Sequence, residues 1–251
     1  MDWQTIRLDE VDSTSSFLKR NAAELPHRLV VRADTQTGGR GRLGREWFSP
    51  RGGLYMSLLL RPAPEPEVAA LIPLVGAYLI CGIFSERTGI PALVKWPNDV
   101  IVPAGKMAGI LAEYGGRKEP WLVLGFGLNL ADRPRVYGSG AIPAAAWSEY
   151  GEPPNPEEAQ EIVLEGLDRL WPDERANPLP AIRTRVERLL WMRGREVRAS
   201  VGNRTLRGVV EGLDDLGHLR LYGPDGAAVL DSGEIRPEPL DSPTTIPGGA
   251  T

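Results

Sequence analysis

Residues 36–47 read QTGGRGRLGREW, and this stretch decides which nucleotide-binding folds the chain can adopt. Its glycines satisfy the GxGxxG spacing of a dinucleotide-binding turn, which requires a helix that opens on the glycines. The chain instead continues as WFSPRGG over residues 47–53, which cannot be helical. The pair Arg45-Glu46 stands where a Walker loop needs Lys followed by Ser or Thr. The stretch therefore excludes both a Rossmann fold and a P-loop fold.

Residues 36–47, which we call the Arg/Gly loop, alternate the arginines Arg40, Arg42 and Arg45 with glycines. Glycine lets the backbone approach a ligand closely, and an arginine fork binds two phosphate or carboxylate oxygens at once. Trp47 ends the loop and offers an aromatic face to a base. Taken alone, the loop fits an anion-binding site, a solvated basic segment or an RNA-binding segment.

Apolar runs on both sides of the Arg/Gly loop predict a mixed β-sheet with helices packed on it, which is an α+β fold. Helices are expected from the capping residues at 12–15 to about Glu24, from Asn155 onward, and over residues 179–192. The uncharged residues 68–85 reach the lower length of a membrane span, but their Pro and Gly content and acidic flanks favour a helix buried against the sheet. The predicted strands cover residues 4–8, 29–31, 53–60, 92–95, 100–102, 107–113 and 121–130.

After Gly194 the pattern changes to short strands separated by Gly and Asp turns. Several such strands close together predict a small SH3-like barrel. We therefore expect a main domain over residues 1–192, the barrel over residues 193–240 and a flexible tail over residues 241–251. The predicted strands of the barrel cover residues 196–199, 207–212, 218–221 and 228–230.

The composition excludes several kinds of chemistry. The chain has 251 residues, a formal net charge of −4, one cysteine and two histidines. A single cysteine excludes an internal disulfide and a cysteine-based zinc cage, and two histidines argue against a His-dependent triad or a multi-His metal site. The net charge argues against a surface built to coat nucleic acid. We therefore expect Arg, Lys, Asn, Asp and backbone groups to carry the chemistry, in a protein that lacks the pattern of a secretion signal and is cytoplasmic.

Two further motifs, KWPND at residues 95–99 and KMAGIL at residues 106–111, lie on a predicted hairpin. The hairpin brings Asp99 opposite Lys106, and an ammonium oriented in this way can stabilise a developing oxyanion. A surface ion pair fits the same two residues. A third motif, GFGLNL, allows a strand to carry Asn129 close to a ligand.

Together, these motifs occur in an order that resembles the biotin protein ligases over residues 1–240. The resemblance implies a catalytic domain with a fold like that of class II aminoacyl-tRNA synthetases, followed by an SH3-like barrel. The family has Ser-Thr-Asn near its start, whereas this chain reads Ser-Thr-Ser at residues 13–15. Larger members add a DNA-binding helix-turn-helix before the catalytic domain. This chain starts directly at the catalytic domain, so the resemblance implies the monofunctional form.

The resemblance also implies a reaction in two steps. Such enzymes use MgATP to convert biotin to biotinyl-5′-AMP and pyrophosphate, and then pass biotin to a lysine of the biotin carboxyl carrier protein of acetyl-CoA carboxylase. Mg²⁺ would be held mainly by the ATP phosphates, with Asn129 as an additional ligand. No covalent enzyme intermediate is needed, which agrees with the scarcity of His and Cys. We expect no DNA or membrane partner, and an exposed sheet edge suits a homodimer or docking of the carrier.

The resemblance assigns roles to the matching residues. Lys106, oriented by Asp99, would stabilise the charge that develops during adenylation, and Arg42 would help it hold the biotin carboxylate and the α-phosphate. Arg45 would contact the phosphates, and Trp47 would cover the adenine. The expected biotin-binding residues are Ser13, Thr14, Ser15, Gln36, Gly39, Arg40, Gly41, Arg42 and Lys106, and the expected nucleotide-binding residues are Arg42, Arg45, Trp47, Asn98, Lys106 and Asn129.

Three alternatives use the same residues. A lipoate or octanoate protein ligase shares the fold, but its acid lacks the ureido ring that the Arg/Gly loop fits. A nucleic-acid-binding module would use the arginines and Trp47 for phosphates and bases, against which the net charge argues. A biotin-binding protein without enzymatic activity would leave Lys106 and Asn129 without a purpose.

We predict that the Arg/Gly loop is mobile in the empty protein and ordered by ligand, because most of its residues are Gly or Arg and few are apolar. Limited tryptic digestion should cleave the chain between Arg40 and Arg45 when it is empty and spare it in the presence of biotin and ATP. Equal cleavage under both conditions would contradict the prediction.

Overall fold

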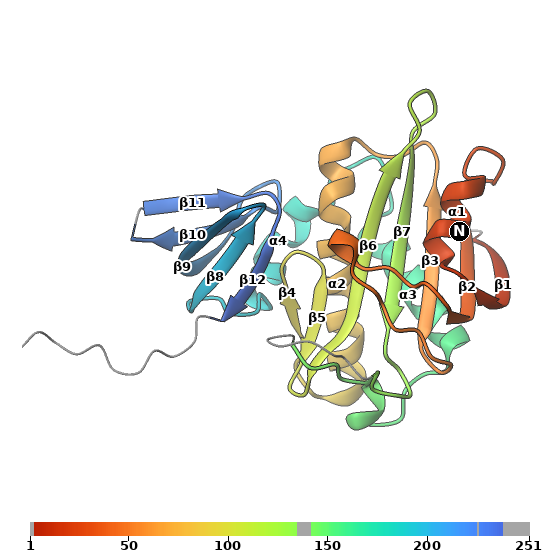
Figure 1. Cartoon of the computed structure of the whole chain (residues 1–251), viewed down its shortest axis with the longest axis horizontal. Coiled ribbons are helices and arrows are strands. Elements are labelled where there is room, and N and C mark those ends of the chain that lie inside the picture. The colour runs from red at the N-terminus through yellow and green to blue at the C-terminus, as the bar shows by residue number, and fades with distance from the viewer. Residues whose placement is uncertain (1–2, 135–141, 225, 238–251) are drawn as a thin grey trace, which may run out of the picture.

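The computed structural model describes residues 3–134, 142–224 and 226–237. The chain forms two β-sheets side by side, with helices packed on the larger one (Figure 1). The predicted flexible tail at residues 241–251 lies outside the described residues.

Seven strands form the larger sheet: β1 (Gln4–Val11), β2 (Leu29–Gln36), β3 (Leu54–Leu60), β4 (Leu93–Lys95), β5 (Asp99–Val102), β6 (Gly105–Gly115) and β7 (Trp121–Leu128). Their order is β1-β2-β3-β7-β6-β5-β4. β1 and β2 run parallel, and all other neighbours are antiparallel. The sheet is therefore mixed, as predicted, with β3 and β7 near its centre.

Helices cover both faces of this sheet (Figure 1): α1 (Thr14–Asn21) lies on one face, and α2 (Pro66–Thr88) and α3 (Pro156–Leu170) lie on the other. The alternation of side chains along β2 explains the arrangement. Val31 packs into a small core with Leu18 of α1, whereas Val30 joins the large core that includes α2 and α3. Every residue of β3 is buried because both of its faces are covered, which confirms the prediction of a central strand.

α2 is the apolar helix that the uncharged residues 68–85 predict. Among the described residues it is the one helix long and apolar enough to cross a membrane, yet most of it is buried inside the protein. Gly76 allows this close packing, since a Cβ there would lie 3.2 Å from the Phe126 ring of β7 and 3.3 Å from Ile110 of β6. The face of the sheet beneath α2 is thus filled, and the opposite face is left for α1 and for the loops.

The starts of α1 and α3 follow their capping residues, but two helices end earlier than predicted. Ser13 caps α1 and Asn155 caps α3, as the sequence predicts, and the Asn155 backbone N–H in turn donates a hydrogen bond to the Glu158 carboxylate. α1, expected to reach about Glu24, ends at Asn21, where the Glu24 N–H turns back to the Asn21 carbonyl. The helix predicted over residues 179–192 is shorter: α4 spans Leu179–Arg188. Backbone hydrogen bonds between Val94 of β4 and residues 189 and 191 take the place of the last helical turn, so the chain there extends the sheet.

The C-terminal strands, predicted as a small SH3-like barrel, form an antiparallel sheet in the order β11-β10-β9-β8-β12. The strands are β8 (Glu196–Val201), β9 (Arg204–Leu213), β10 (Leu219–Gly223), β11 (Gly226–Leu230) and β12 (Glu234–Pro237). Val197, Val210 and Ile235 join the same hydrophobic core as the main sheet. The indole Nε1 of Trp96, between β4 and β5, donates a hydrogen bond to the Gly217 carbonyl at 3.0 Å. The small sheet is therefore docked beside the β4–β5 edge, with β12 facing it.

We predict that Asn155→Ala destabilises the protein by roughly 1 kcal/mol, because it removes the side-chain acceptor for the first turn of α3. Urea unfolding checks this, with Asn155→Ser as a control that keeps a capping oxygen and should retain most of the stability. A free energy of unfolding that is the same for Asn155→Ala and the original chain would contradict the prediction.

Candidate functional site

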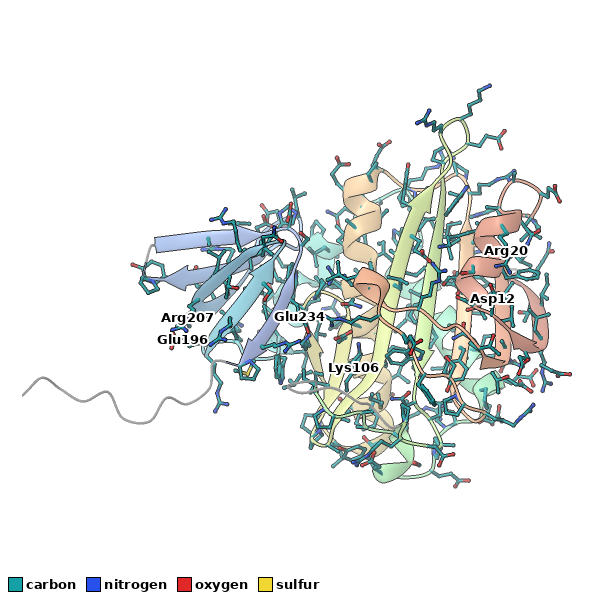
Figure 2. The ribbon with its side chains drawn as sticks, viewed as in Figure 1. Asp12, Arg20, Lys106, Glu196, Arg207 and Glu234 are labelled. Atoms are coloured by element: carbon teal, nitrogen blue, oxygen red, sulfur yellow. The ribbon has the colours of Figure 1, made fainter. Side chains whose placement is uncertain are left out.

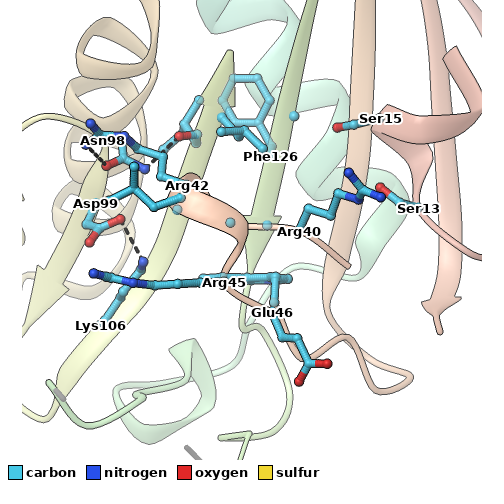
Figure 3. A pocket seen from close by; sticks show the side chains of 18 of the residues that line it. Ser13, Ser15, Arg40, Arg42, Arg45, Glu46, Asn98, Asp99, Lys106 and Phe126 are labelled. Carbon is cyan, nitrogen blue, oxygen red and sulfur yellow. Dashed lines mark hydrogen bonds and ion pairs between the residues drawn. The ribbon is translucent and has the colours of Figure 1, made fainter. Parts of the chain in front are cut away.

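The main pocket lies between the Arg/Gly loop and the face of the larger sheet that α2 leaves open (Figure 3). It is a cavity of about 860 Å³ that includes its open mouth. Its walls come from the start of α1, the Arg/Gly loop, the strands β3 to β7 and the start of β12. All but two of the predicted site residues line it: Ser13, Thr14, Ser15, Gln36, Arg40, Gly41, Arg42, Arg45, Trp47, Asn98, Asp99 and Lys106.

A cluster of hydroxyl groups and one amide forms one end of the pocket. Ser57 of β3, which is fully buried, lies 2.7 Å from the Thr14 hydroxyl and 2.9 Å from the Ser15 hydroxyl. The Gln36 side-chain oxygen accepts hydrogen bonds from the backbone N–H of Thr14 at 2.9 Å and from its hydroxyl at 3.2 Å. Because hydroxyl and amide groups can donate and accept, this end suits a small planar group that carries both N–H and C=O.

Ser57 was missed by sequence reasoning, although a signal was present. It is the one residue with an aliphatic hydroxyl in LYMSLLL, a strand whose residues are all buried. A buried hydroxyl must have hydrogen-bond partners, and Thr14 and Ser15 supply them. Ser15 therefore belongs to the polar cluster, because its hydroxyl is hydrogen-bonded to Ser57 of β3.

The indole of Trp47 forms a wall of the pocket against two facing glycines. Gly109 of β6 and Gly127 of β7 are directly paired. A Cβ on Gly127 would lie 2.5 Å from the indole, and one on Gly109 would lie 3.2 Å from it. The glycine pair thus makes a flat surface on which the indole rests, 5.2 Å (ring centroid) from the Lys106 ammonium.

Positive charge gathers at the other end of the pocket. The Lys106 ammonium lies 2.7 Å from one oxygen of Asp99, and the Lys95 ammonium lies 3.4 Å from the other oxygen. The predicted Asp99–Lys106 pair is therefore confirmed, but the two residues are not directly opposite. Asp99 pairs with Gly109, and a register shift between Val100 and Ile101 brings the Lys106 side chain within reach. Lys95 is an additional member that the sequence reasoning did not select.

Two arginines of the Arg/Gly loop contact the C-terminal unit. Arg42 donates hydrogen bonds to the Asn98 side-chain oxygen at 3.4 Å and to the Gly233 carbonyl at 3.2 Å. Arg45 binds both carboxylate oxygens of Glu234. Lys106 and Glu234 lie on opposite sides of the junction between the two sheets (Figure 2). The C-terminal unit therefore contributes to the pocket, which sequence reasoning missed because nothing local marks Gly233 or Glu234.

The environment shifts the pKa of these groups in ways that match their contacts. Burial lowers the pKa of Arg42, and the Asp99 charge acts in the opposite direction. Burial alone would raise the pKa of Glu234, but the hydrogen bond and charge of Arg45 outweigh it and lower that pKa. The same hydrogen bond raises the pKa of Arg45. The pair is thus ionised over the physiological range and holds the loop to the C-terminal unit.

Two predicted residues lie outside the pocket wall. A side chain at Gly39 would overlap the Trp47 carbonyl, so this glycine serves the close packing of the loop. Asn129 is only 2% exposed, and its amide N–H groups donate to the Ala145 carbonyl at 2.9 Å and the Lys106 carbonyl at 3.5 Å. The structure therefore places Asn129 behind Lys106, where it holds the start of β6, and not at the pocket surface.

Comparison with known proteins agrees with this geometry. Residues 8–129 match the model of the biotin/lipoate A/B protein ligase family, and residues 194–236 match that of the biotin protein ligase C-terminal domain. The biotin--[acetyl-CoA-carboxylase] ligase of Paracoccus denitrificans is 33% identical over 239 residues, which cover 91% of this chain and 98% of the relative. The bifunctional ligase/repressor BirA of Bacillus subtilis is 29% identical, covering 91% of this chain and 71% of the relative.

A solved structure, the biotin protein ligase from Aquifex aeolicus in complex with biotin and ATP, superimposes with a TM-score of 0.78 at 29% identity. The match covers 93% of this chain and 97% of that one. Both sheets of this chain therefore have counterparts in that enzyme.

We predict that Gly127→Ala destabilises the protein by about 1–3 kcal/mol, because the added methyl group meets the Trp47 indole. Gly82→Ala is the matched control: a Cβ at this exposed position in α2 meets nothing within 4 Å. It should stabilise the helix by roughly 0.5–1 kcal/mol. Urea unfolding of both variants checks the pair, and a Gly127→Ala chain as stable as Gly82→Ala would contradict the described packing.

Proposed function

Because this chain belongs to the biotin protein ligases, we propose that the hydroxyl end of its pocket binds the biotin ring and the cationic end binds the groups that react. The chain is an ATP-dependent ligase that attaches biotin, with biotin and ATP as substrates and acetyl-CoA carboxylase as acceptor. The match of residues 194–236 to the C-terminal domain of biotin protein ligases separates it from lipoate ligases. This assignment of the two ends is supported by one observation: the residues of both ends line the same cavity.

In the first step, a carboxylate oxygen of biotin attacks the α-phosphorus of ATP, and the bond to the bridging oxygen of pyrophosphate breaks. Two anions must approach each other, which costs free energy unless cations lie between them. Lys106 and Arg42 line the pocket where this would occur, and Asn98 orients Arg42 through its side-chain oxygen. The residues therefore act by positioning and by electrostatic stabilisation of the transition state.

At the other end, we propose that Ser13, Thr14, Ser15 and Gln36, with the backbone at Arg40 and Gly41, hold the ureido ring. The hydroxyl cluster around Ser57 supports this, because it presents donors and acceptors at fixed distances. Ser57 joins this set as the residue that links Thr14 to Ser15. Specificity for biotin over an acid without a ureido ring would then come from buried polar groups that such an acid leaves unpaired.

We propose that Trp47 and Arg45 receive the nucleotide. The Trp47 indole stands beside Lys106 and offers an aromatic face for the adenine. The Arg45 guanidinium, which is bound to Glu234 in this structure, would contact the ATP phosphates. A closed loop would also keep water from the adenylate, which hydrolyses readily.

In the second step, the lysine amine of the acceptor attacks the acyl carbon, AMP leaves with the electron pair of the broken bond, and the amine loses a proton. We propose the biotin carboxyl carrier protein as the specific acceptor subunit, which accords with the acetyl-CoA-carboxylase ligases among the relatives. Among the described strands β1 has a neighbour on one side only. Its outer edge suits strand addition by the carrier or by a second copy of this chain.

We propose that Mg²⁺ enters with ATP and is held mainly by its phosphates. The described residues bring together no group of three or more His, Cys, Asp and Glu side chains that could cage the ion. The pocket carboxylates Asp99 and Glu234 are each bound to cationic side chains. Asn129, an additional candidate ligand, lies behind the pocket wall.

We also propose that the protein acts in the cytoplasm, because its apolar helix α2 is buried in the hydrophobic core.

Biotin-dependent exchange of labelled pyrophosphate into ATP tests the assignment of the pocket. We predict exchange with biotin and none with lipoate, and a tighter calorimetric affinity for biotin in the presence of MgATP. Thr14→Val should weaken biotin binding by roughly 10- to 100-fold, because it leaves Ser57 and Gln36 short of a partner. Exchange driven by lipoate, or a Thr14→Val chain with unchanged affinity for biotin, would contradict the assignment.

A further inference from the structure

Lys95 is a buried cation that the roles described so far leave unused. Only 6% of its side chain is exposed, compared with 29% for Lys106. Lys95 and Asp99 are directly paired residues of the antiparallel strands β4 and β5. Lys95 lines the pocket, and its ammonium contacts the Asp99 oxygen that Lys106 does not. One carboxylate is thus shared by a buried lysine and a lysine that faces the cavity.

Burying an ammonium is costly, which makes the presence of Lys95 informative. Burial lowers the pKa of Lys95, because desolvation outweighs the attraction of Asp99. A lysine that only neutralised Asp99 would be redundant, since Lys106 lies closer to that carboxylate at 2.7 Å. The group of Lys95, Asp99 and Lys106 carries two positive charges and one negative charge. The group therefore has a net positive charge. Lys106 is the more exposed of the two lysines, so its ammonium is the one that can reach an anion in the cavity.

We propose that Lys95 is a positioning residue: it keeps Asp99 paired when Lys106 leaves that carboxylate for the anions of the substrates. Without Lys95, moving Lys106 toward a phosphate would leave a buried Asp99 without a counter-charge, which strongly disfavours the movement. With Lys95 in place, the carboxylate keeps a partner in both positions of Lys106. Lys95 itself is the last residue of β4, is paired with Asp99 of β5 and needs no contact with substrate.

This inference rests on the proposed role of Lys106 in the first step, so the experiment isolates that step. Pyrophosphate exchange requires no acceptor protein and reports adenylation alone. Lys95→Met removes the charge and keeps most of the side-chain volume. We predict that it lowers the exchange kcat roughly 100-fold, the size expected when an electrostatic contribution to the transition state is lost. Because the hydroxyl end of the pocket is untouched, the affinity for biotin alone should change less than threefold.

The decisive variant is the double substitution Lys95→Met/Asp99→Asn. Removing the carboxylate frees Lys106 again, so we predict exchange at least tenfold faster than in Lys95→Met alone. Lys95→Arg, which keeps the charge, should also recover part of the rate. A merely structural role of Lys95 would instead make the free energy of unfolding and the affinity for biotin fall and recover together with the exchange rate, because removing one partner of a buried ion pair destabilises the fold and removing both does not. Urea unfolding and biotin titration of the same variants separate the two roles. Lys95→Gln, alone and combined with Asp99→Asn, repeats the comparison if Lys95→Met does not fold.

Two controls separate the possible failures. Lys19→Met removes a lysine that is bound to Glu113 and does not line the pocket, and it should leave exchange unchanged. Lys106→Met should abolish exchange, and full activity in that variant would overturn the proposed role of Lys106 together with this inference. If Lys106→Met is inactive while Lys95→Met is fully active, or while the double variant is no faster than Lys95→Met, only the inference about Lys95 is overturned.

Discussion

The pairing of β6 with β7 is the interaction on which both sides of the protein depend. On one face of the pair, Ile110 and Phe126 pack against Gly76 of α2, which fixes the helix layer. On the other face, the paired glycines Gly109 and Gly127 leave room for the Trp47 indole. Because side chains alternate between the faces of a strand, a shift of one residue would exchange these environments and place large apolar side chains in the pocket. Core packing and pocket shape are thus determined by one register.

The positive charge of the pocket depends on which side chains the fold brings into it, and not on the net charge of the chain. The chain is acidic overall, with a net charge of −4, yet Lys95, Lys106, Arg42 and Arg45 converge on one cavity. Two carboxylates are interleaved with them: Asp99 binds the two lysines, and Glu234 binds Arg45. Lys95 and Lys106 are thus preorganised for anions on strands β4 and β6, and the arginines of the Arg/Gly loop join them when ligand orders the loop.

Most elements and most pocket residues could be predicted from the sequence, because their signals are local. The caps at Ser13 and Asn155, the all-buried strand β3 and the Arg/Gly loop each depend on neighbouring residues. Contacts between segments that lie far apart in the chain were missed. Ser57 stood in a recognised strand, but its role depends on Thr14 and Ser15, and the end of α4 depends on hydrogen bonds to Val94. Lys95 lies only four residues from Asp99 and was passed over because its burial beside that carboxylate is not visible in the sequence. Asn129 was assigned to the ligand because its burial behind Lys106 is a tertiary property.

The contact between Arg45 and Glu234 also has a consequence for biogenesis. These residues are 189 positions apart, and the strands of the larger sheet are all complete by Leu128. During synthesis the amino-terminal part of a chain emerges first and folds as soon as its partners are available. The hydroxyl end of the pocket can therefore assemble on the ribosome well before Glu234 has been translated. The wall that holds the loop arginines arrives last, so a nascent chain should acquire its biotin-ring site before it acquires a complete nucleotide site.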